Sequence, residues 1–328
     1  MAVHVPVLLD EVMDLLQPAP GGVLLDGTLG LGGHALVWLR ATAKAGETGR
    51  VVGCDRDAEA LTAATERLEA EFPGALHAHH GSYEEASQAV ADSGVAAVDA
   101  ALMDLGVSSL QLDAGGRGFS LRTQGPLDMR MDASSGRTAA DLVNESPEHE
   151  LADLIARFGE EPKARRVARA IVLERRRAPF RDTLRLAECV ANALGGRRGR
   201  LHPATRTFQG IRIALNDELG RLERGLPAVA ACLRPGGHMG VITFHRLEDA
   251  PTKRFFREGV SDGTFAAEPD RTPSRAEIGR NPRSRSARLR GACIAAQTSS
   301  NRASTSTNAA SAKRDVAAET EIVEGDAR

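Results

Sequence analysis

Residues 23–34 read Val-Leu-Leu-Asp-Gly-Thr-Leu-Gly-Leu-Gly-Gly-His, and this stretch says more about the fold than any other. A short apolar run ends at Asp26, a glycine-rich turn follows, and a helical pattern begins near His34. With such a strand, turn and helix start, a doubly wound α/β sheet binds a nucleotide-like cofactor. Glycine suits the turn, because the backbone bends sharply and a ligand approaches where a Cβ would collide.

The glycine spacing narrows the choice of cofactor only in part. Position 35 is Ala, so the Gly-x-Gly-x-x-Gly pattern of dinucleotide-binding dehydrogenases is incomplete. Gly30 and Gly32, four and six positions after Asp26, better suit S-adenosylmethionine (SAM), which has no phosphates. The stretch alone leaves both cofactors about equally open. A Leu-x-Pro-Gly-Gly turn at 233–237, before a late strand, is frequent in SAM-dependent methyltransferases and favours SAM.

Length and composition place the chain in a broad class. A chain of 328 residues predicts about two domains, and a hydrophobic content of 42% suffices for a substantial core. The net charge of −2 gives no sign of nucleic-acid binding for the molecule as a whole. The four cysteines form no Cys-x-x-Cys pair, which fits a reducing cytoplasm and suggests neither zinc nor disulfides. Without a signal peptide or a long apolar run, we expect a cytoplasmic protein with no membrane partner.

Strand and helix patterns alternate in the first third of the chain. Strand-like runs occupy residues 23–26, 51–55, 76–79 and 98–104. Helical patterns separate the first three runs, which implies βαβ units and a parallel sheet. Asp57 is well placed to cap the helix after the second run. We therefore predict an α/β fold of the Rossmann-like, doubly wound type.

The alternation stops after Asp104 and resumes at a strand over residues 238–244. We interpret the helical block between them as an inserted domain at 107–206. The α/β domain is then discontinuous, formed by residues 1–106 and 207–296. Residues 297–328, rich in Ser, Thr, Asn and Ala, are predicted to be a disordered low-complexity tail.

Helix boundaries in this block follow from caps and periodicity. Ser146 and Pro147 are expected to be the N-cap and first position of one helix. Two more are predicted at residues 162–177 and 183–194, the latter stopped by two glycines. Apolar residues at helical spacing over 208–226 predict one long amphipathic helix.

Acidic residues at strand ends are the candidate ligand-binding groups. Asp55 ends the second strand, where a carboxylate can accept both ribose hydroxyls of an adenosine; its alternative role, as a helix cap, suits Asp57 better. Asp104 ends the fourth strand and should face the cofactor. It could bind the amino group of SAM's methionine moiety, orient an attacking amine, or simply form a turn before Gly106. His245, beside Glu248 and Asp249 after the late strand, could line the substrate side, or these acids could cap a helix.

Basic residues gather in three places despite the low net charge. Arg165, Arg169 and Arg176 fall on one helical stripe. A second group, after the glycine pair, comprises Arg197, Arg198, Arg200, His202 and Arg206. Residues 271–290 hold seven arginines and one acid, Glu277. Three such groups predict a surface that meets phosphates, and ordered RNA fits better than duplex DNA because no recognition-helix motif occurs.

Taken together, these pieces resemble the RsmH (MraW) family of bacterial 16S rRNA methyltransferases. The resemblance runs from His4-Val-Pro-Val-Leu-Leu-Asp-Glu11 to about Arg290. It includes Asp55-Arg-Asp57, Met103-Asp-Leu-Gly-Val-Ser-Ser-Leu-Gln-Leu-Asp113, Arg117-Gly-Phe-Ser120 and Gly125-Pro-Leu-Asp-Met-Arg-Met-Asp132. It continues through His202-Pro-Ala-Thr-Arg-Thr-Phe-Gln209, Phe244-His-Arg-Leu-Glu-Asp249 and Asn281-Pro-Arg-Ser-Arg-Ser286. So many long motifs in order make the match specific.

The resemblance implies a class I SAM-dependent methyltransferase fold with an inserted helical domain. It also implies N4-methylation of a cytosine in the decoding region of 16S rRNA, cytosine 1402 in customary numbering, with 16S rRNA in the 30S subunit as the expected partner. No metal is expected. By motif match the cofactor-binding residues are Gly32, Gly33, His34, Asp55, Tyr83, Asp104 and Gln111. The residues expected to meet RNA are Arg165, Arg169, Arg197, Arg198, Arg206, His245 and Arg246.

The chain departs from the family pattern at a few positions. Tyr83 stands where the family usually has Phe, and it can still stack on adenine. Leu31 replaces a usual Arg and Leu110 a usual Pro, and both changes look tolerable. Arg246 replaces the Ser of the family's Phe-His-Ser-Leu-Glu-Asp motif. A long cation at that place could contact RNA phosphate or impair the site.

The expected reaction is an in-line transfer of methyl to the cytosine amine, with Asp104 positioning that amine as the one catalytic candidate. The target base must leave its stack to reach such a pocket. Two other functions stay open from the sequence: a nicotinamide oxidoreductase, and a non-catalytic SAM-binding ribosome assembly factor. The oligomeric state also stays open, a homodimer included.

Overall fold

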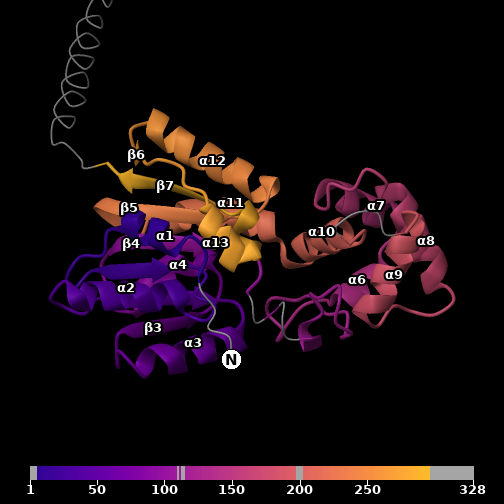
Figure 1. Ribbon diagram of the computed structural model, residues 1–328, viewed down its shortest axis with the longest axis horizontal. Coiled ribbons are helices and arrows are strands. Elements are labelled where there is room, and N and C mark those ends of the chain that lie inside the picture. The colour runs from indigo at the N-terminus through magenta and orange to yellow at the C-terminus, as the bar shows by residue number, and fades with distance from the viewer. Residues whose placement is uncertain (1–5, 109–110, 112–114, 197–201, 296–328) are drawn as a thin grey trace, which may run out of the picture.

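The computed structural model describes residues 6–108, 111, 115–196 and 202–295, which form two lobes (Figure 1). One lobe is a sheet covered by helices on both faces, and the other is a group of helices inserted into it. The predicted tail, the departure at Leu110 and the expected RNA-binding residues Arg197 and Arg198 lie outside the described residues. No helix within the described ranges is long and apolar enough to cross a membrane.

The sheet has seven strands in the order β3-β2-β1-β4-β5-β7-β6. The strands are β1 (Val23–Asp26), β2 (Arg50–Asp55), β3 (Leu76–His80), β4 (Val98–Asp104), β5 (Leu233–Thr243), β6 (Phe265–Ala267) and β7 (Arg288–Ile294). The first five are parallel, and β7 runs antiparallel to β5 and β6. The chain therefore leaves β1 toward β2 on one side and returns to β4 on the other. Doubly wound sheets bind their ligands at this switch point, beyond the carboxyl ends of the strands.

The helices of the sheet lobe pack on its two faces. Their bounds are α1 (Leu9–Leu16), α2 (Gly33–Lys44), α3 (Ala58–Glu69), α4 (Ala86–Asp92), α11 (Glu218–Ala230), α12 (Arg246–Ser261) and α13 (Arg275–Arg280), with short 3-10 turns η1 (Tyr83–Glu85) and η3 (Pro282–Ser286). Successive strand residues alternate between faces: Leu24 joins the core under α1 and α2, and Leu25 joins the core under α4, α11 and α12. Both cores are mainly aliphatic, with Trp38 buried in the first and Phe256 and Phe265 in the second.

The inserted lobe has a core of its own. It contains η2 (Gly115–Arg117), α6 (Ala139–Glu145), α7 (Glu148–Arg157), α8 (Ala164–Arg175), α9 (Thr183–Ala193) and α10 (Thr205–Asn216). Phe208 and Ile211 of α10 are buried in this core beside Ile155 and Ile171. A boundary at residue 206 would therefore cut through α10, and we propose that the insert extends to Asn216.

Sequence patterns predicted the first four strands to within one residue. The late strand predicted at 238–244 begins five residues earlier, at Leu233, and β6 and β7 were not predicted. Two helix predictions were wrong. The single helix over 208–226 is two helices, because Asp217 adopts a left-handed conformation with φ of 50°. A four-residue step between Leu215 and Leu219 preserves helical spacing across the break and hides it. Ser146 does not cap α7: it ends α6, and Pro147 precedes α7 without a side-chain cap.

Candidate functional site

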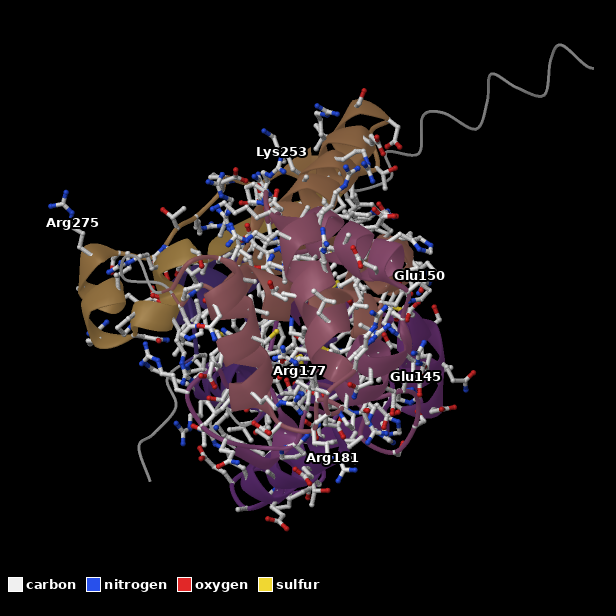
Figure 2. The ribbon with its side chains drawn as sticks, turned by 90° about the vertical axis from the view of Figure 1, so that its right-hand side faces the viewer. Glu145, Glu150, Arg177, Arg181, Lys253 and Arg275 are labelled. Atoms are coloured by element: carbon white, nitrogen blue, oxygen red, sulfur yellow. The ribbon has the colours of Figure 1, made fainter. Side chains whose placement is uncertain are left out.

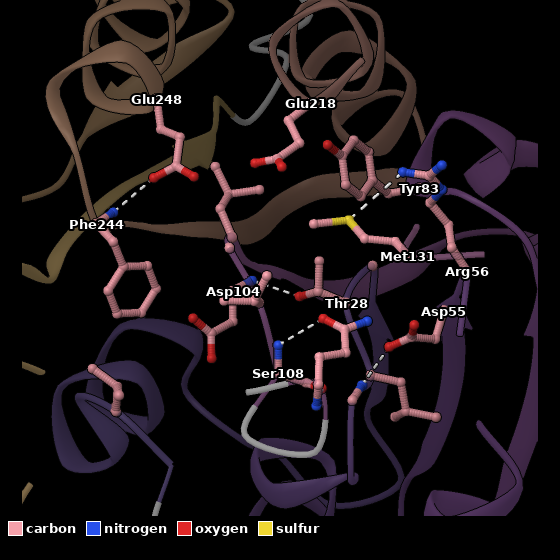
Figure 3. A pocket seen from close by; sticks show the side chains of 18 of the residues that line it. Thr28, Asp55, Arg56, Tyr83, Asp104, Ser108, Met131, Glu218, Phe244 and Glu248 are labelled. Carbon is pink, nitrogen blue, oxygen red and sulfur yellow. Dashed lines mark hydrogen bonds between the residues drawn. The ribbon is translucent and has the colours of Figure 1, made fainter. Parts of the chain in front are cut away.

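A pocket of about 390 Å³ lies at the carboxyl ends of β1, β2, β4 and β5 (Figure 3). That volume is typical of a small-ligand site. We name its two sides by what builds them. The glycine-loop half comprises residues 27–31, 33 and 34 with Asp55, Tyr83 and Gln111, and the β5 half comprises Arg212, Glu218, Phe244, His245 and Glu248. Gly32, expected to bind the cofactor, does not line the pocket. Asp104 lies between the two halves (Figure 3).

The glycine loop follows β1 and has the sharp turn that the sequence predicted. Gly30 and Gly32 have φ of 53° and 70°, which glycine adopts without strain. At positions 32 and 33 the protein's own packing gives a further reason for glycine, and the predicted approach of a ligand stays a prediction. A Cβ at Gly32 would lie 3.2 Å from Leu68, and one at Gly33 would lie 2.6 Å from the Pro6 ring. These two glycines make room for the protein's own packing.

Asp55 and Asp57 anchor the loop from β2. The Gly30 amide donates to Asp55 at 2.7 Å, so this carboxylate fixes the turn as well as lining the pocket. Asp57 caps α3 by accepting from the Glu59 amide, as predicted. Gln111 donates to Asp57 at 2.9 Å and accepts from the Ser108 amide, so its amide holds the segment after β4 against the loop. The ribose contact of Asp55 and the cofactor contact of Gln111 stay predictions.

Asp104 lies at the junction of the halves, with its side chain 27% exposed and its Oδ1 buried. Its Oδ1 has no hydrogen-bond partner among the described residues, and its Oδ2 lies 3.9 Å from His34 Nδ1. Burial, followed by repulsion from Asp26 and Glu248, raises the pKa of Asp104 to about 8. Burial likewise raises the pKa of Asp26 to about 7. A cation bound beside Asp104 would favour its ionised form, so the group is suited to a positively charged ligand.

His34 and Tyr83 close the glycine-loop half. The ring of His34 lies 3.0 Å from the Val7 carbonyl, which ties the segment before α1 to the start of α2. The Tyr83 ring packs so closely against α11 that a Cβ at Gly225 would lie 2.2 Å from it. Burial raises the pKa of the Tyr83 hydroxyl. Both residues line the pocket, and stacking of Tyr83 on adenine stays a prediction.

The β5 half is built from charged side chains of three helices. Arg212 of α10 donates to both oxygens of Glu218 in α11, at 2.8 and 2.9 Å. Glu248 of α12 is 3% exposed and accepts from the Phe244 amide at 2.8 Å. His245 caps α12 and forms a reciprocal capping box with Glu248. His245 and Glu248 therefore both cap a helix and line the pocket. Asp249 does not line it, and its carboxylate accepts from Arg290 instead.

Arginines expected to meet RNA lie on the inserted lobe and beside the pocket. Arg165 and Arg169 are exposed on α8, and Arg206 is exposed on α10. Arg246 is exposed at the start of α12 and forms an ion pair with Glu160, in the turn between α7 and α8. It therefore connects the two lobes across a groove that Arg157, Lys163 and Arg165 also line.

Sequence reasoning missed part of the site. Arg212 and Glu218 were seen only as positions in a helix, and no local pattern marks them as pocket residues. Asn281 and Arg283, near the end of the sheet lobe, line the pocket together with Pro6. The Leu8 amide donates to Glu277 of α13 at 2.9 Å, which brings the two ends of the described chain together at this rim.

The strand order and the pocket define a class I SAM-dependent methyltransferase, with SAM as its cofactor. The profile of the family described as "MraW methylase family" matches residues 1–294, and the chain belongs to that family. This confirms the resemblance seen in the sequence, and it removes the nicotinamide alternative. The residues present fit SAM, because Asp104 Oδ1 lies buried beside the glycine loop with no hydrogen-bond partner among the described residues, and it can accept a hydrogen bond from a cationic ligand.

Two relatives with the same name agree with this assignment. The "Ribosomal RNA small subunit methyltransferase H" of Pelobacter propionicus is 46% identical over 88% of this chain and 97% of its own length. The protein of the same name from Nitratidesulfovibrio vulgaris strain DP4 is 47% identical over 89% of this chain and 95% of its own length. An rRNA methylase structure from Streptococcus thermophilus is 11% identical with a TM-score of 0.38, over 88% of this chain and 93% of that chain.

Proposed function

We propose that the protein methylates the N4 amine of one cytosine, cytosine 1402, in the decoding region of small-subunit rRNA. The names of the relatives support small-subunit rRNA as the substrate. The observation that carries the chemistry is the partnerless Asp104 Oδ1, buried between the glycine loop and the β5 half. A primary amine that entered the pocket there would donate to this oxygen and so satisfy it.

The mechanism follows from how the pocket divides. SAM supplies an electrophilic methyl group on a good leaving group, so the protein mainly has to position the amine for in-line attack. The amine is a weak nucleophile, because its lone pair is delocalised into the cytosine ring. A hydrogen bond from the amine to ionised Asp104 moves the nitrogen toward tetrahedral geometry and directs its lone pair at the methyl carbon. Asp104 is therefore the catalytic residue in this proposal.

The inserted lobe would hold the RNA on either side of the flipped base. Figure 2 looks onto this lobe: Glu145 and Glu150 lie on one side of it, and Arg275 of α13 lies on the opposite side. Arg165 lines the groove beside Arg246, on the pocket side of the insert. Arginines there would bind phosphates flanking the target, and Arg246 would exchange its exposed pair with Glu160 for a phosphate.

The direct test uses labelled SAM and 30S subunits from cells that lack this methylation, with naked 16S rRNA as a parallel substrate. We expect one methyl group per 16S rRNA, and mass mapping should place it on the N4 amine of a decoding-region cytosine. Incorporation at another nucleotide would contradict the cytosine assignment. Binding of SAM without any incorporation would favour the non-catalytic assembly factor instead.

The RNA surface has its own test in the salt dependence of binding. Replacing Arg165 and Arg169 by Glu should weaken rRNA binding about tenfold or more at physiological salt and reduce the slope of log K against log salt by about two. The matched control, with the same change of net charge, is Arg40→Glu with Lys44→Glu, two exposed cations four residues apart on α2 in the other lobe. Equal losses in both variants would show that the effect is one of net charge alone.

A further inference from the structure

The β5 half contains a buried nitrogen, His245 Nε2, that makes no hydrogen bond to the described residues. His245 is oriented as a capping residue: its Nδ1 accepts from the Glu248 amide at 3.3 Å. An imidazole that accepts through Nδ1 carries its proton on Nε2 in the neutral form. Nε2 is buried and has no hydrogen-bond partner among the described residues. Glu248 Oε1 lies 3.3 Å away, but it lies too far from the direction of the Nε2–H bond to accept from it. The capping bond to Nδ1 therefore sets the tautomer of His245, and its Nε2–H is a donor inside the pocket.

Its surroundings keep this imidazole neutral. Burial, followed by the nearby Arg212 cation, lowers the pKa of His245 to about 4. The carboxylates of Glu218 in α11 and Glu160 in the α7–α8 turn act in the opposite direction and are outweighed. Arg212 is itself held by both oxygens of Glu218, so its charge stays beside the ring. His245 is therefore a neutral donor at any pH at which the enzyme would work.

The same side chains could suggest a metal, but the contacts argue against it. Single ligand atoms of Glu218, His245 and Glu248 lie within 4.8 Å of one another. Both Glu218 oxygens already accept from Arg212, and a metal would need the Nε2 lone pair that the capping tautomer removes. A guanidinium inside the group also opposes a divalent cation. The group is better suited to a neutral, hydrogen-bonding ligand.

His245 and Asp104 line the same pocket at the ends of neighbouring strands. Asp104 pairs in register with Ile242 on the neighbouring strand, and His245 lies three residues beyond Ile242. Both residues line the same pocket from the ends of adjacent strands, so an acceptor oxygen on Asp104 and a donor on His245 can meet one ligand there. The carboxylates of Glu218 and Glu248 point into the same upper part of the pocket, above Asp104 (Figure 3).

We propose that His245 reads the target base: its Nε2–H donates a hydrogen bond to N3 of the cytosine whose amine Asp104 receives. Cytosine presents a donor and then an acceptor along this edge, the amine and N3, and the pocket presents an acceptor and then a donor. Uracil presents O4 and N3–H in the same places. Its O4, an acceptor, would face the Asp104 carboxylate, and its N3–H, a donor, would face the donor of His245. This inference rests on the proposed function, and it makes His245 the residue that separates the two pyrimidines.

The test compares two substrates with the unaltered protein. One is 30S reconstituted with native 16S rRNA, and the other carries 3-deazacytosine, in which N3 is replaced by a carbon, at the target position. We expect kcat/KM to fall at least tenfold on the deaza substrate, because a site built around a hydrogen bond is left with an unpaired donor. Equal rates on both would overturn the inference.

A variant separates reading from helix capping. His245→Asn keeps a good N-cap for α12 but is too short to place a donor at N3. Its kcat/KM on cytosine should fall at least tenfold, with less than a threefold further loss on 3-deazacytosine, while SAM affinity by calorimetry stays within twofold. If this variant still prefers cytosine over 3-deazacytosine as strongly as the unaltered protein does, the proposed role of His245 is contradicted. If the unaltered protein methylates no cytosine amine in native 30S, the proposed function itself fails, and this inference fails with it.

Discussion

The two halves of the pocket are built in different ways, and the difference separates binding from recognition. The glycine-loop half comes from four short segments that follow β1, β2, β3 and β4, and it positions its ligand largely through backbone geometry fixed by Asp55. The β5 half takes Arg212, Glu218 and Glu248 from three helices and combines their charges in one buried network. A backbone turn suits a cofactor common to many enzymes. A network of side chains suits one particular base.

The largest expected effect is at Asp104, where the halves meet. Asp104→Ala should lower kcat/KM for methyl transfer by about 10³-fold, the size of loss typical when a charged positioning group is removed from a buried site. Labelled-methyl incorporation measures this. Asp104→Asn is the matched control, because the amide can still accept one hydrogen bond but carries no charge; it should retain more activity than the Ala variant. Turnover by Asp104→Ala within threefold of the unaltered protein would remove Asp104 from the mechanism.

The next effect contrasts a buried ion pair with an exposed one. Arg212→Met leaves Glu218 buried without its cation, and should lower the free energy of unfolding by about 3 kcal/mol. Arg246→Ser removes only the exposed pair with Glu160, and the melting temperature should stay essentially unchanged. Denaturant unfolding and thermal melts measure the two. In Arg212→Met with Glu218→Leu, stability should recover; no recovery would mean that Arg212 acts through something other than Glu218.

A third prediction uses the pKa of Asp104 to probe the junction. The folded pKa, about 8, lies above the ordinary value of 3.8, so the protonated form favours folding and this contribution is lost as pH rises through about 8. SAM, a cation, favours the ionised form instead. Its affinity should rise between pH 6 and 8, by at most about tenfold per pH unit for one proton, with proton release visible in calorimetry. A flat profile, or the same slope in Asp104→Asn, would contradict the assignment.

The smallest effect tests whether the glycine-loop half acts independently of the β5 half. Gly33→Ala adds a Cβ 2.6 Å from Pro6 and should displace the segment before α1. We expect SAM affinity to fall several-fold, while preference for cytosine over 3-deazacytosine persists. Gly116→Ala is the control, because no described residue lies within 4 Å of its added Cβ and its φ is ordinary. Loss of base preference in Gly33→Ala would show that the halves are coupled.

Sequence alone predicted the parallel strands, the inserted lobe and the cofactor class. Each depends on local signals: apolar runs that end at Asp26, Asp55 and Asp104, glycines that permit positive φ, and a cap at Asp57. Such signals can be recognised in the sequence, because the turn and the strand that carry them are contiguous. The sequence pattern did not predict the break between α10 and α11 at Asp217, because apolar residues continue at helical spacing across it.

Only the tertiary structure assembled the β5 half. Arg212 and Glu218 have no local pattern of their own, since a charged residue on a helix is usually solvated, and burial against α12 gives them their role. The tautomer of His245 likewise depends on a bond to the first turn of α12. The sequence determined that a strand–turn–helix site for SAM exists. The packing of α10, α11 and α12 decided what the other side of that site can recognise, because only there do distant charges come within hydrogen-bonding distance in a buried, low-dielectric setting.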